Sequence, residues 1–191
     1  MTKILDFLRQ ILDRCTMADK LFKVRFITTG GTIEKTYDEF HGALENKYTQ
    51  LEQRILHKLR LPYFSYQVSS LLSKDSLFFT DDDRELIVKE ISSCLDDQLD
   101  AVIVIHGTDT MAQTAELVKS SLVGVSIPII FTGAMKPMGF DDSDALQNVT
   151  EALMSSRFLG AGVYISFHGQ VFEVPWVRKN REKLTFESTK K

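Results

Sequence analysis

Three short, continuous apolar runs limit the folds open to this chain more than any other feature. Segments with the apolar spacing of a helix separate them, and a strand-breaking residue ends each run. The run at 101–105 has no polar alternation, which is typical of a strand covered on both faces. The runs lie at 101–105, 127–132 and 162–167, and we expect helices at 109–123 and 141–157. This rhythm predicts an α/β domain with a three-layer, doubly wound, mainly parallel sheet and helices on both faces.

The amino-terminal part fits the same plan. Residues 23–28 form a β-branched and aromatic run that stops at two glycines, so they predict a strand entering a tight turn. Residues 65–69 are a candidate second strand. Thr80 precedes three aspartates and an apolar stripe, which indicates an N-cap and a helix. The main domain is therefore expected over 21–191.

Residues 1–20 predict an amphipathic helical extension. Charged residues recur every three or four positions, which argues against the uninterrupted core of a signal peptide and favours a cytoplasmic protein. The helix could dock on the domain or a partner, or have no function. Alternatively translation starts at Met17, which the intact mass of the natively expressed protein would reveal.

Composition excludes several classes of protein. The 191 residues hold 26 acidic and 23 basic side chains, a net charge of −3, with no local basic patch for nucleic acid. No apolar run approaches the roughly 20 residues of a membrane span. The two cysteines, Cys15 and Cys94, are too few for a disulfide framework or zinc site and are expected to be free thiols. We expect no metal and no cofactor.

Ligands of such sheets bind beyond the carboxyl ends of the strands, so the residues after each apolar run are candidates. Two of these loops carry glycines and threonines, at 29–32 and 106–110. A threonine hydroxyl needs a neighbouring base to become a nucleophile, and glycine-flanked amides can stabilise an oxyanion. The residues alone predict a threonine-rich site of an α/β hydrolase or binding protein.

Three segments, ITTGGTIEK from Ile27, VIVIHGTDTMAQTA from Val102 and FTGAMKP from Phe131, resemble the bacterial-type L-asparaginase/glutaminase family. The resemblance covers about 23–185. It implies hydrolysis of the side-chain amide of L-asparagine, or alternatively glutamine, to a carboxylate and ammonia through a threonine acyl-enzyme. An amidase for another amide, or a binding module for aspartate or asparagine with little turnover, are the alternatives.

The resemblance also implies roles for individual residues. Thr32 matches the family's nucleophile, while Thr108 and Asp109 match its second catalytic threonine and the aspartate that holds the substrate's amino group. Lys179 lies 71 residues after Thr108 and matches the catalytic lysine. Lys136 is the rival, at a position that is often a structural arginine.

Substrate contacts are expected from Gly31, Gly107, Thr108 and Asp109, and from Ser73 and Asp75 in place of the family's carboxylate-binding serine loop. The resemblance also implies a lid tyrosine. Tyr48 fits this role, with Tyr37 as the alternative.

The histidines are expected to have other roles. His106 and His168 follow strands and are interpreted as structural. His41 and His57 show no metal-ligand spacing.

Family members carry a second, smaller carboxy-terminal domain that helps to form the dimer. This sequence ends 12 residues after Lys179, so the resemblance implies a compact protein with the amino-terminal domain only. A homodimer or tetramer is expected, with a small-molecule amide as substrate and no nucleic acid or membrane partner. The last residues are interpreted as a solvated tail, or as a segment whose Leu184 and Phe186 dock on a second copy of the chain.

Overall fold

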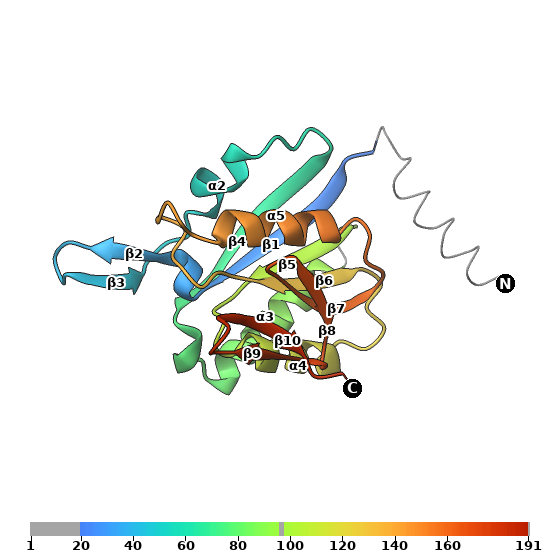
Figure 1. Cartoon of the computed structure of the whole chain (residues 1–191). Helices are drawn as coiled ribbons and strands as arrows, with labels where there is room; N and C mark the ends of the chain where they lie inside the picture. The colour runs from blue at the N-terminus through green and yellow to red at the C-terminus, as the bar shows by residue number, and fades with distance from the viewer. Residues whose placement is uncertain (1–19, 96–97, 191) are drawn as a thin grey trace, which may run out of the picture.

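The computed structural model describes residues 20–95 and 98–190, and Figure 1 shows their arrangement. The predicted extension at 1–20 falls almost wholly outside the described residues. Within them no helix is both long and apolar enough to cross a membrane.

A six-stranded sheet forms the centre of the domain. Five strands are parallel and the last is antiparallel, in the order β4-β1-β5-β6-β7-β8. Their bounds are β1 Phe22–Gly30, β4 Phe64–Lys74, β5 Ala101–Ile105, β6 Pro128–Thr132, β7 Gly162–Phe167 and β8 Gln170–Glu173. The chain moves outward from β1 to β4 and then returns to add β5 on the other side of β1. The strand order therefore reverses between β1 and β5, the place where such sheets bind ligands.

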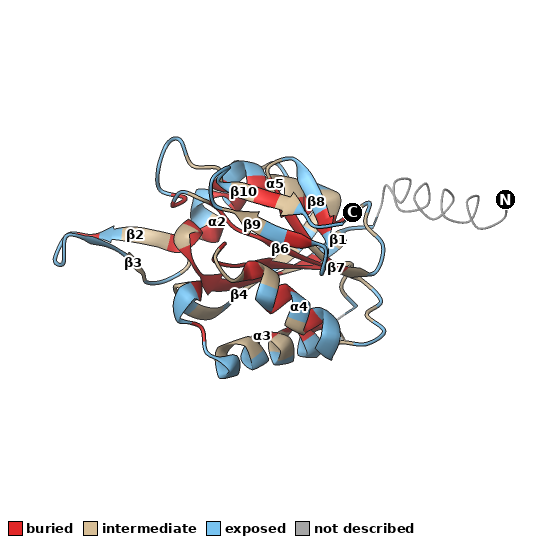
Figure 2. Ribbon diagram, turned by 60° about the horizontal axis from the view of Figure 1, so that its bottom comes forward, coloured by how far each residue is buried: buried red, intermediate tan, exposed pale blue. Residues whose placement is uncertain are grey.

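Helices cover both faces of this sheet, which confirms the predicted fold class (Figures 1 and 2). On one face lie α2 (Leu51–Arg54), the 3-10 helix η2 (Leu56–Lys58) and α5 (Ala145–Ser155), and on the other α3 (Asp81–Cys94) and α4 (Met111–Ser121). In β5, Ile103 and Ile105 pack against the first group while Val102 and Val104 pack against the second. All five residues of β5 are buried, because both faces are covered.

The predicted start of α3 is confirmed in detail. The Thr80 hydroxyl accepts the Asp83 N–H, and the Asp83 carboxylate accepts the Thr80 N–H in return, which completes a capping box. The helices expected at 109–123 and 141–157 form shorter segments, since loop residues precede α4 and α5.

Two hairpins lie beside the main sheet. β2 (Lys35–Asp38) pairs with β3 (Ala43–Asn46) and projects from the body, while β9 (Val177–Asn180) pairs with β10 (Thr185–Ser188) near α4 (Figure 1). The expectation of a solvated tail is wrong, since Phe186 is buried and its ring lies 5.0 Å from that of Phe167. Phe186 therefore docks within its own chain, and only Leu184 of the pair is exposed.

Candidate active site

The loops that follow the parallel strands meet at the carboxyl edge of the sheet, and glycines allow the contact. A side chain at Gly31 would overlap the Cα of Gly107, and one at Gly107 would overlap the hydroxyl of Ser76. A side chain at Gly133 would overlap the carbonyl of His106. Backbone approach this close requires glycine. The loops after β1, β4, β5 and β6 consequently form one packed cluster.

The first threonine loop is held through its backbone N–H groups, which donate to β4 and to a carboxylate. Gly31 has φ +83° and leads into the 3-10 helix η1 (Thr32–Glu34). The Gly31 N–H donates to the Lys74 carbonyl at 3.0 Å, and the Gly30 N–H donates to the Glu34 carboxylate at 2.9 Å. Thr32 is half-buried, and its hydroxyl has no hydrogen-bond partner among the described residues. The loop is thus fixed while the hydroxyl is unengaged.

The second threonine loop is bound by a cation from a distant part of the chain. Lys179 donates from Nζ to the Thr108 hydroxyl at 2.7 Å and to Asp109 Oδ1 at 3.1 Å. The Thr108 hydroxyl in turn faces the Met135 sulfur at 3.9 Å. The structure therefore brings together the three residues that the sequence grouped as a proton-handling cluster.

Lys179 reaches this position because β9 and β10 form a hairpin. Val177 on β9 and Phe186 on β10 are buried in the core, so they attach the hairpin to the body on either side of the lysine. The rival, Lys136, instead pairs with Asp142 in an exposed loop. Of the two candidate lysines, only Lys179 contacts Thr108.

Ser73 and Asp75, expected to hold the substrate, have other partners. The Ser73 hydroxyl donates to the carbonyl of Lys47, at the surface. Asp75 accepts from Lys35 Nζ at 2.6 Å and caps η3 (Ser76–Phe78) by accepting the Leu77 N–H. Burial alone would raise the pKa of Asp75, but the bond from Lys35 and its charge keep that pKa below its usual value.

Ser76 is the serine that the structure brings to the site. It is fully buried, its hydroxyl has no partner among the described residues, and that hydroxyl lies against Gly107. The Ser76 carbonyl accepts the Thr110 hydroxyl at 3.0 Å, which joins it to the second threonine loop. The sequence did not single out Ser76, because the resemblance matched the family's serine loop to Ser73 and Asp75.

Glu34 is a second residue that the sequence reasoning missed. It is buried behind the first threonine loop, and Oε1 has no partner among the described residues. Burial raises the pKa of Glu34 to about 7, and the nearby Thr49 hydroxyl, the Gly30 N–H and the Thr28 hydroxyl together offset only part of that shift. An acidic residue at the end of the otherwise uncharged, glycine-containing TGGTIE segment is the signal that could have identified it.

His106 lies behind the second loop, and its pKa is shifted in the opposite direction to that of Glu34. Its ring is fully buried between Phe79 and Phe131, and Nδ1 lies 2.8 Å from the Gly107 carbonyl. Burial lowers the pKa of His106 to about 4, so the ring is neutral at physiological pH. A buried neutral ring that contacts its own loop supports the structural role expected for it.

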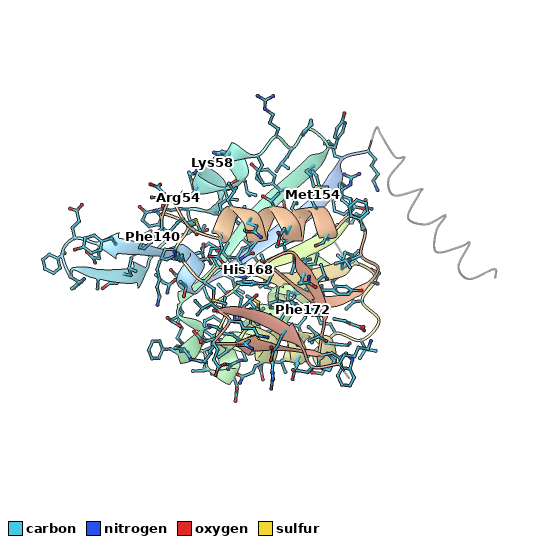
Figure 3. The ribbon with its side chains drawn as sticks, viewed as in Figure 1. Arg54, Lys58, Phe140, Met154, His168 and Phe172 are labelled. Atoms are coloured by element: carbon cyan, nitrogen blue, oxygen red, sulfur yellow. The ribbon has the colours of Figure 1, made fainter. Side chains whose placement is uncertain are left out.

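His168 also has a structural environment, and it links three strand-end segments (Figure 3). Its Nε2 lies 2.9 Å from Asp144, whose carboxylate also accepts the N–H groups of Met135 and Lys136. Its Nδ1 lies 3.1 Å from the Thr185 hydroxyl on β10. This network holds the β6 loop and the β9–β10 hairpin in fixed relation.

Neither candidate lid tyrosine reaches the cluster. Tyr48 and Tyr37 are 69% and 64% exposed. Tyr37 lies on β2, and its hydroxyl is near the position that a side chain on Gly42 would take, at the hairpin turn. Tyr48 follows β3, next to Lys47, the residue that Ser73 contacts. Its role as the lid tyrosine stays a prediction.

The β2–β3 hairpin brings together three side chains of types that can bind a metal. Ligand atoms of Asp38, His41 and Glu45 lie within 4.8 Å of one another, although the sequence spacing around His41 gave no such indication. The Lys47 ammonium lies 3.0 Å from Asp38 and already compensates its charge. The arrangement is that of a surface ion-pair cluster.

Known proteins resemble this chain in sequence, and solved structures resemble it in fold. A glutamyl-tRNA(Gln) amidotransferase component of Methanobrevibacter smithii is 27% identical over 148 residues, covering 78% of this chain and 34% of the relative. L-asparaginase 1 of Escherichia coli K12 is 32% identical over 130 residues, covering 65% and 37%. The solved thermostable L-asparaginase of Thermococcus kodakarensis superposes with a TM-score of 0.80 at 26% identity, covering 87% of this chain and 51% of that one.

This chain spans about a third of the length of those two curated relatives and about half of the solved chain. Most of this chain matches the family, since the family model described as "Asparaginase, N-terminal" aligns with its residues 23–190. The resemblance inferred from the threonine motifs is thereby confirmed. The chain belongs to the asparaginase family, over the region that its amino-terminal model describes.

Proposed function

We propose that this protein hydrolyses the side-chain amide of a small carboxylic acid to a carboxylate and ammonia, with L-asparagine as the first substrate to test and L-glutamine as the second. Membership of the asparaginase family supports amide hydrolysis in general. The observation that carries the proposal is the 2.7 Å contact of Lys179 Nζ with the Thr108 hydroxyl, beside Asp109 and beside the point where the strand order reverses.

The reaction proceeds in two steps. The Thr32 oxygen attacks the amide carbon, the bond from carbon to nitrogen breaks, and the nitrogen leaves as ammonia with the hydroxyl proton. Water then attacks the threonine ester, releasing the acid and returning a proton to Thr32. Thr108 and Lys179 transfer the protons, and Asp109 orients the lysine, as in other triads. The unengaged hydroxyl of Thr32 supports its role as the nucleophile.

The oxyanion formed in each step needs donors that are not already used. The Gly30 and Gly31 N–H groups donate to Glu34 and to Lys74, so they are not available. We assign the oxyanion to amides of the second loop, at Gly107 and Thr108, because Gly107 lies directly against Gly31.

Ser76 is our candidate for holding the substrate's distal carboxylate. An unpaired buried hydroxyl is unfavourable, and a bound carboxylate would accept its hydrogen bond. Ser73 remains as the comparison, since its hydroxyl already has a partner. Ser76→Ala should therefore raise KM by about ten-fold, whereas Ser73→Ala should change it little.

The test is ammonia release from asparagine and glutamine by the purified protein. Thr32→Ala and Thr108→Ala should lower kcat by about 10³-fold or more. Wild-type protein that releases no more ammonia than these variants would contradict the proposal. Stabilisation by aspartate in a thermal-shift assay without turnover would then favour the binding module.

A second candidate follows from the relatives. Several carry the name of a glutamyl-tRNA(Gln) amidotransferase component, which favours an amidase that supplies ammonia to a partner protein. Ammonia release from glutamine that rises only when a partner is added would support this alternative. The cytoplasmic location and the homo-oligomer stay predictions, the latter testable by size-exclusion chromatography with light scattering.

A further inference from the structure

Asp109, which the family resemblance assigns to the substrate's amino group, already binds two cations. Lys179 Nζ lies 3.1 Å and Arg181 Nη2 2.9 Å from the same oxygen, Oδ1. The side chains of Asp109 and Lys179 are 19% and 17% exposed, whereas that of Arg181 is 73% exposed. Arg181 is therefore the exposed one of the two cations that contact the carboxylate, and a cationic group entering from solvent would compete with it for Oδ1.

The position of Arg181 is set by the backbone. It follows Lys179 by two residues, just after β9, in a turn that the Asn180 side chain organises. Asn180 Oδ1 accepts the N–H groups of Glu182 and Lys183 at 3.1 and 2.9 Å, and its amide donates to Glu187 across the hairpin at 2.8 Å. This turn keeps Arg181 on the side of the hairpin that faces Asp109.

The charges around the site also favour an anion. The ion pairs made by Asp75 and Asp109 bring three cations, Lys35, Lys179 and Arg181, to these two carboxylates. An amino-acid amide would bring a fourth cation to a carboxylate that two cations already compensate. A monoamide with a distal carboxylate and no amino group would instead supply the missing negative charge.

We propose that Arg181 is a specificity-determining residue: its guanidinium occupies the place on Asp109 that an α-ammonium group would take, so the site prefers monoamides of dicarboxylic acids that lack a free amino group, such as succinamate, over asparagine. The inference rests on the proposed amide hydrolysis and leaves its two chemical steps as described. It concerns only which substrate presents the amide.

The test compares asparagine with succinamate, which has the same amide and distal carboxylate but no amino group. Wild type should give the higher kcat/KM with succinamate. Arg181→Ala should shift the ratio of the two kcat/KM values towards asparagine by about five- to ten-fold, the effect of one charge-assisted contact. The matched control is Arg178→Ala on the same hairpin, because Arg178 is similarly exposed but pairs with Glu187. That variant should leave the ratio unchanged.

Binding of the two products gives a readout independent of turnover. Succinate should raise the Tm of the wild type more than aspartate does, and Arg181→Ala should reduce or reverse that difference. Ammonia release from neither amide, with succinate still preferred, would contradict the proposed function and support the inference. A ratio and a Tm difference that Arg181→Ala leaves unmoved would overturn the inference, because the exposed guanidinium would then simply swing away from an incoming ammonium.

Discussion

The two threonine loops have the same plan and are held in different ways. Each follows a buried parallel strand, contains a glycine at the contact between them, and places a threonine next to that glycine. The first is fixed by hydrogen bonds of its own backbone, so Thr32 is left without a partner among the described residues. The second depends on a lysine from a separate hairpin, which engages Thr108. The first loop thus leaves its hydroxyl unengaged and the second binds its hydroxyl to a lysine, and the different roles proposed for Thr32 and Thr108 rest on this contrast.

The largest expected effect concerns the lysine, the feature that most distinguishes the second loop from the first. Lys179→Met removes the contact with Thr108 and should lower kcat by about 10³-fold or more, as loss of a triad member does. Lys136→Met removes only an exposed ion pair and should change kcat by about two-fold or less. Ammonia release measures both, and equal losses would contradict the assignment of the lysine.

The next largest effect is the loss of stability expected when a substitution disrupts the contact between the two loops. Gly31→Ala adds a methyl group that overlaps Gly107 at φ +83°, so backbone strain and overpacking should together destabilise the protein by on the order of 3 kcal/mol. Gly42→Ala is the matched control, since its φ of +64° is also positive but the nearest atom, the Tyr37 hydroxyl at 3.9 Å, is at ordinary contact distance. Its cost should be about 1–2 kcal/mol. Urea unfolding gives both values, and a smaller loss for Gly31→Ala than for Gly42→Ala would show that the loops do not touch.

The smallest expected effect is a change in how stability depends on pH, because each loop has a buried titratable group behind it. Glu34, with a pKa of about 7 when folded and 4.5 as its ordinary value, holds its proton more tightly in the native state. Its contribution to stability is therefore lost as pH rises through 7. His106, with a pKa of about 4 against 6.5, contributes stability that is lost as pH falls from 6.5 towards 4. The two contributions oppose each other between about pH 4.5 and 6.5.

Glu34→Gln keeps the shape of the side chain without its titration. Above pH 8 the variant should be more stable than wild type by on the order of 2–3 kcal/mol, and below pH 4.5 the two should be similar. The variant should also show the rise in stability with pH that His106 causes and that Glu34 masks in the wild type. Urea midpoints from pH 4 to 9 provide the measurement. Parallel curves for the two proteins would mean that the Glu34 pKa is not raised.

Much of the fold could be predicted because its signals are local. The strands Ala101–Ile105 and Gly162–Phe167 have the predicted bounds, and in the first of them burial of all five residues leaves no place for polar side chains. The hairpins could not be predicted in this way. β9 consists of Val177, Arg178, Lys179 and Asn180, and its position depends on the distant contact of Phe186 with Phe167.

The residues of the candidate site could be predicted where sequence motifs contain them. They could not be predicted after β4, where the pairing register of the strand changes. Thr108, Asp109 and Lys179 come together as the spacing implied. Ser76 was not predicted, and β1 and β4 pair irregularly just before it, where Thr28 lies opposite Ser70 but Gly30 lies opposite Lys74. That irregularity adds residues to β4, and counting along the sequence cannot detect it.

The distance along the chain between the two threonine loops and the β9–β10 hairpin has a consequence for synthesis. Chains emerge from the ribosome amino terminus first, and their parts can begin to fold before synthesis ends. Both threonine loops emerge long before Lys179, which follows Thr108 by 71 residues. A nascent chain can thus bury its central strands while its second threonine still lacks its lysine. If Lys179 acts as proposed, the site becomes complete only in a late folding step, when the hairpin docks.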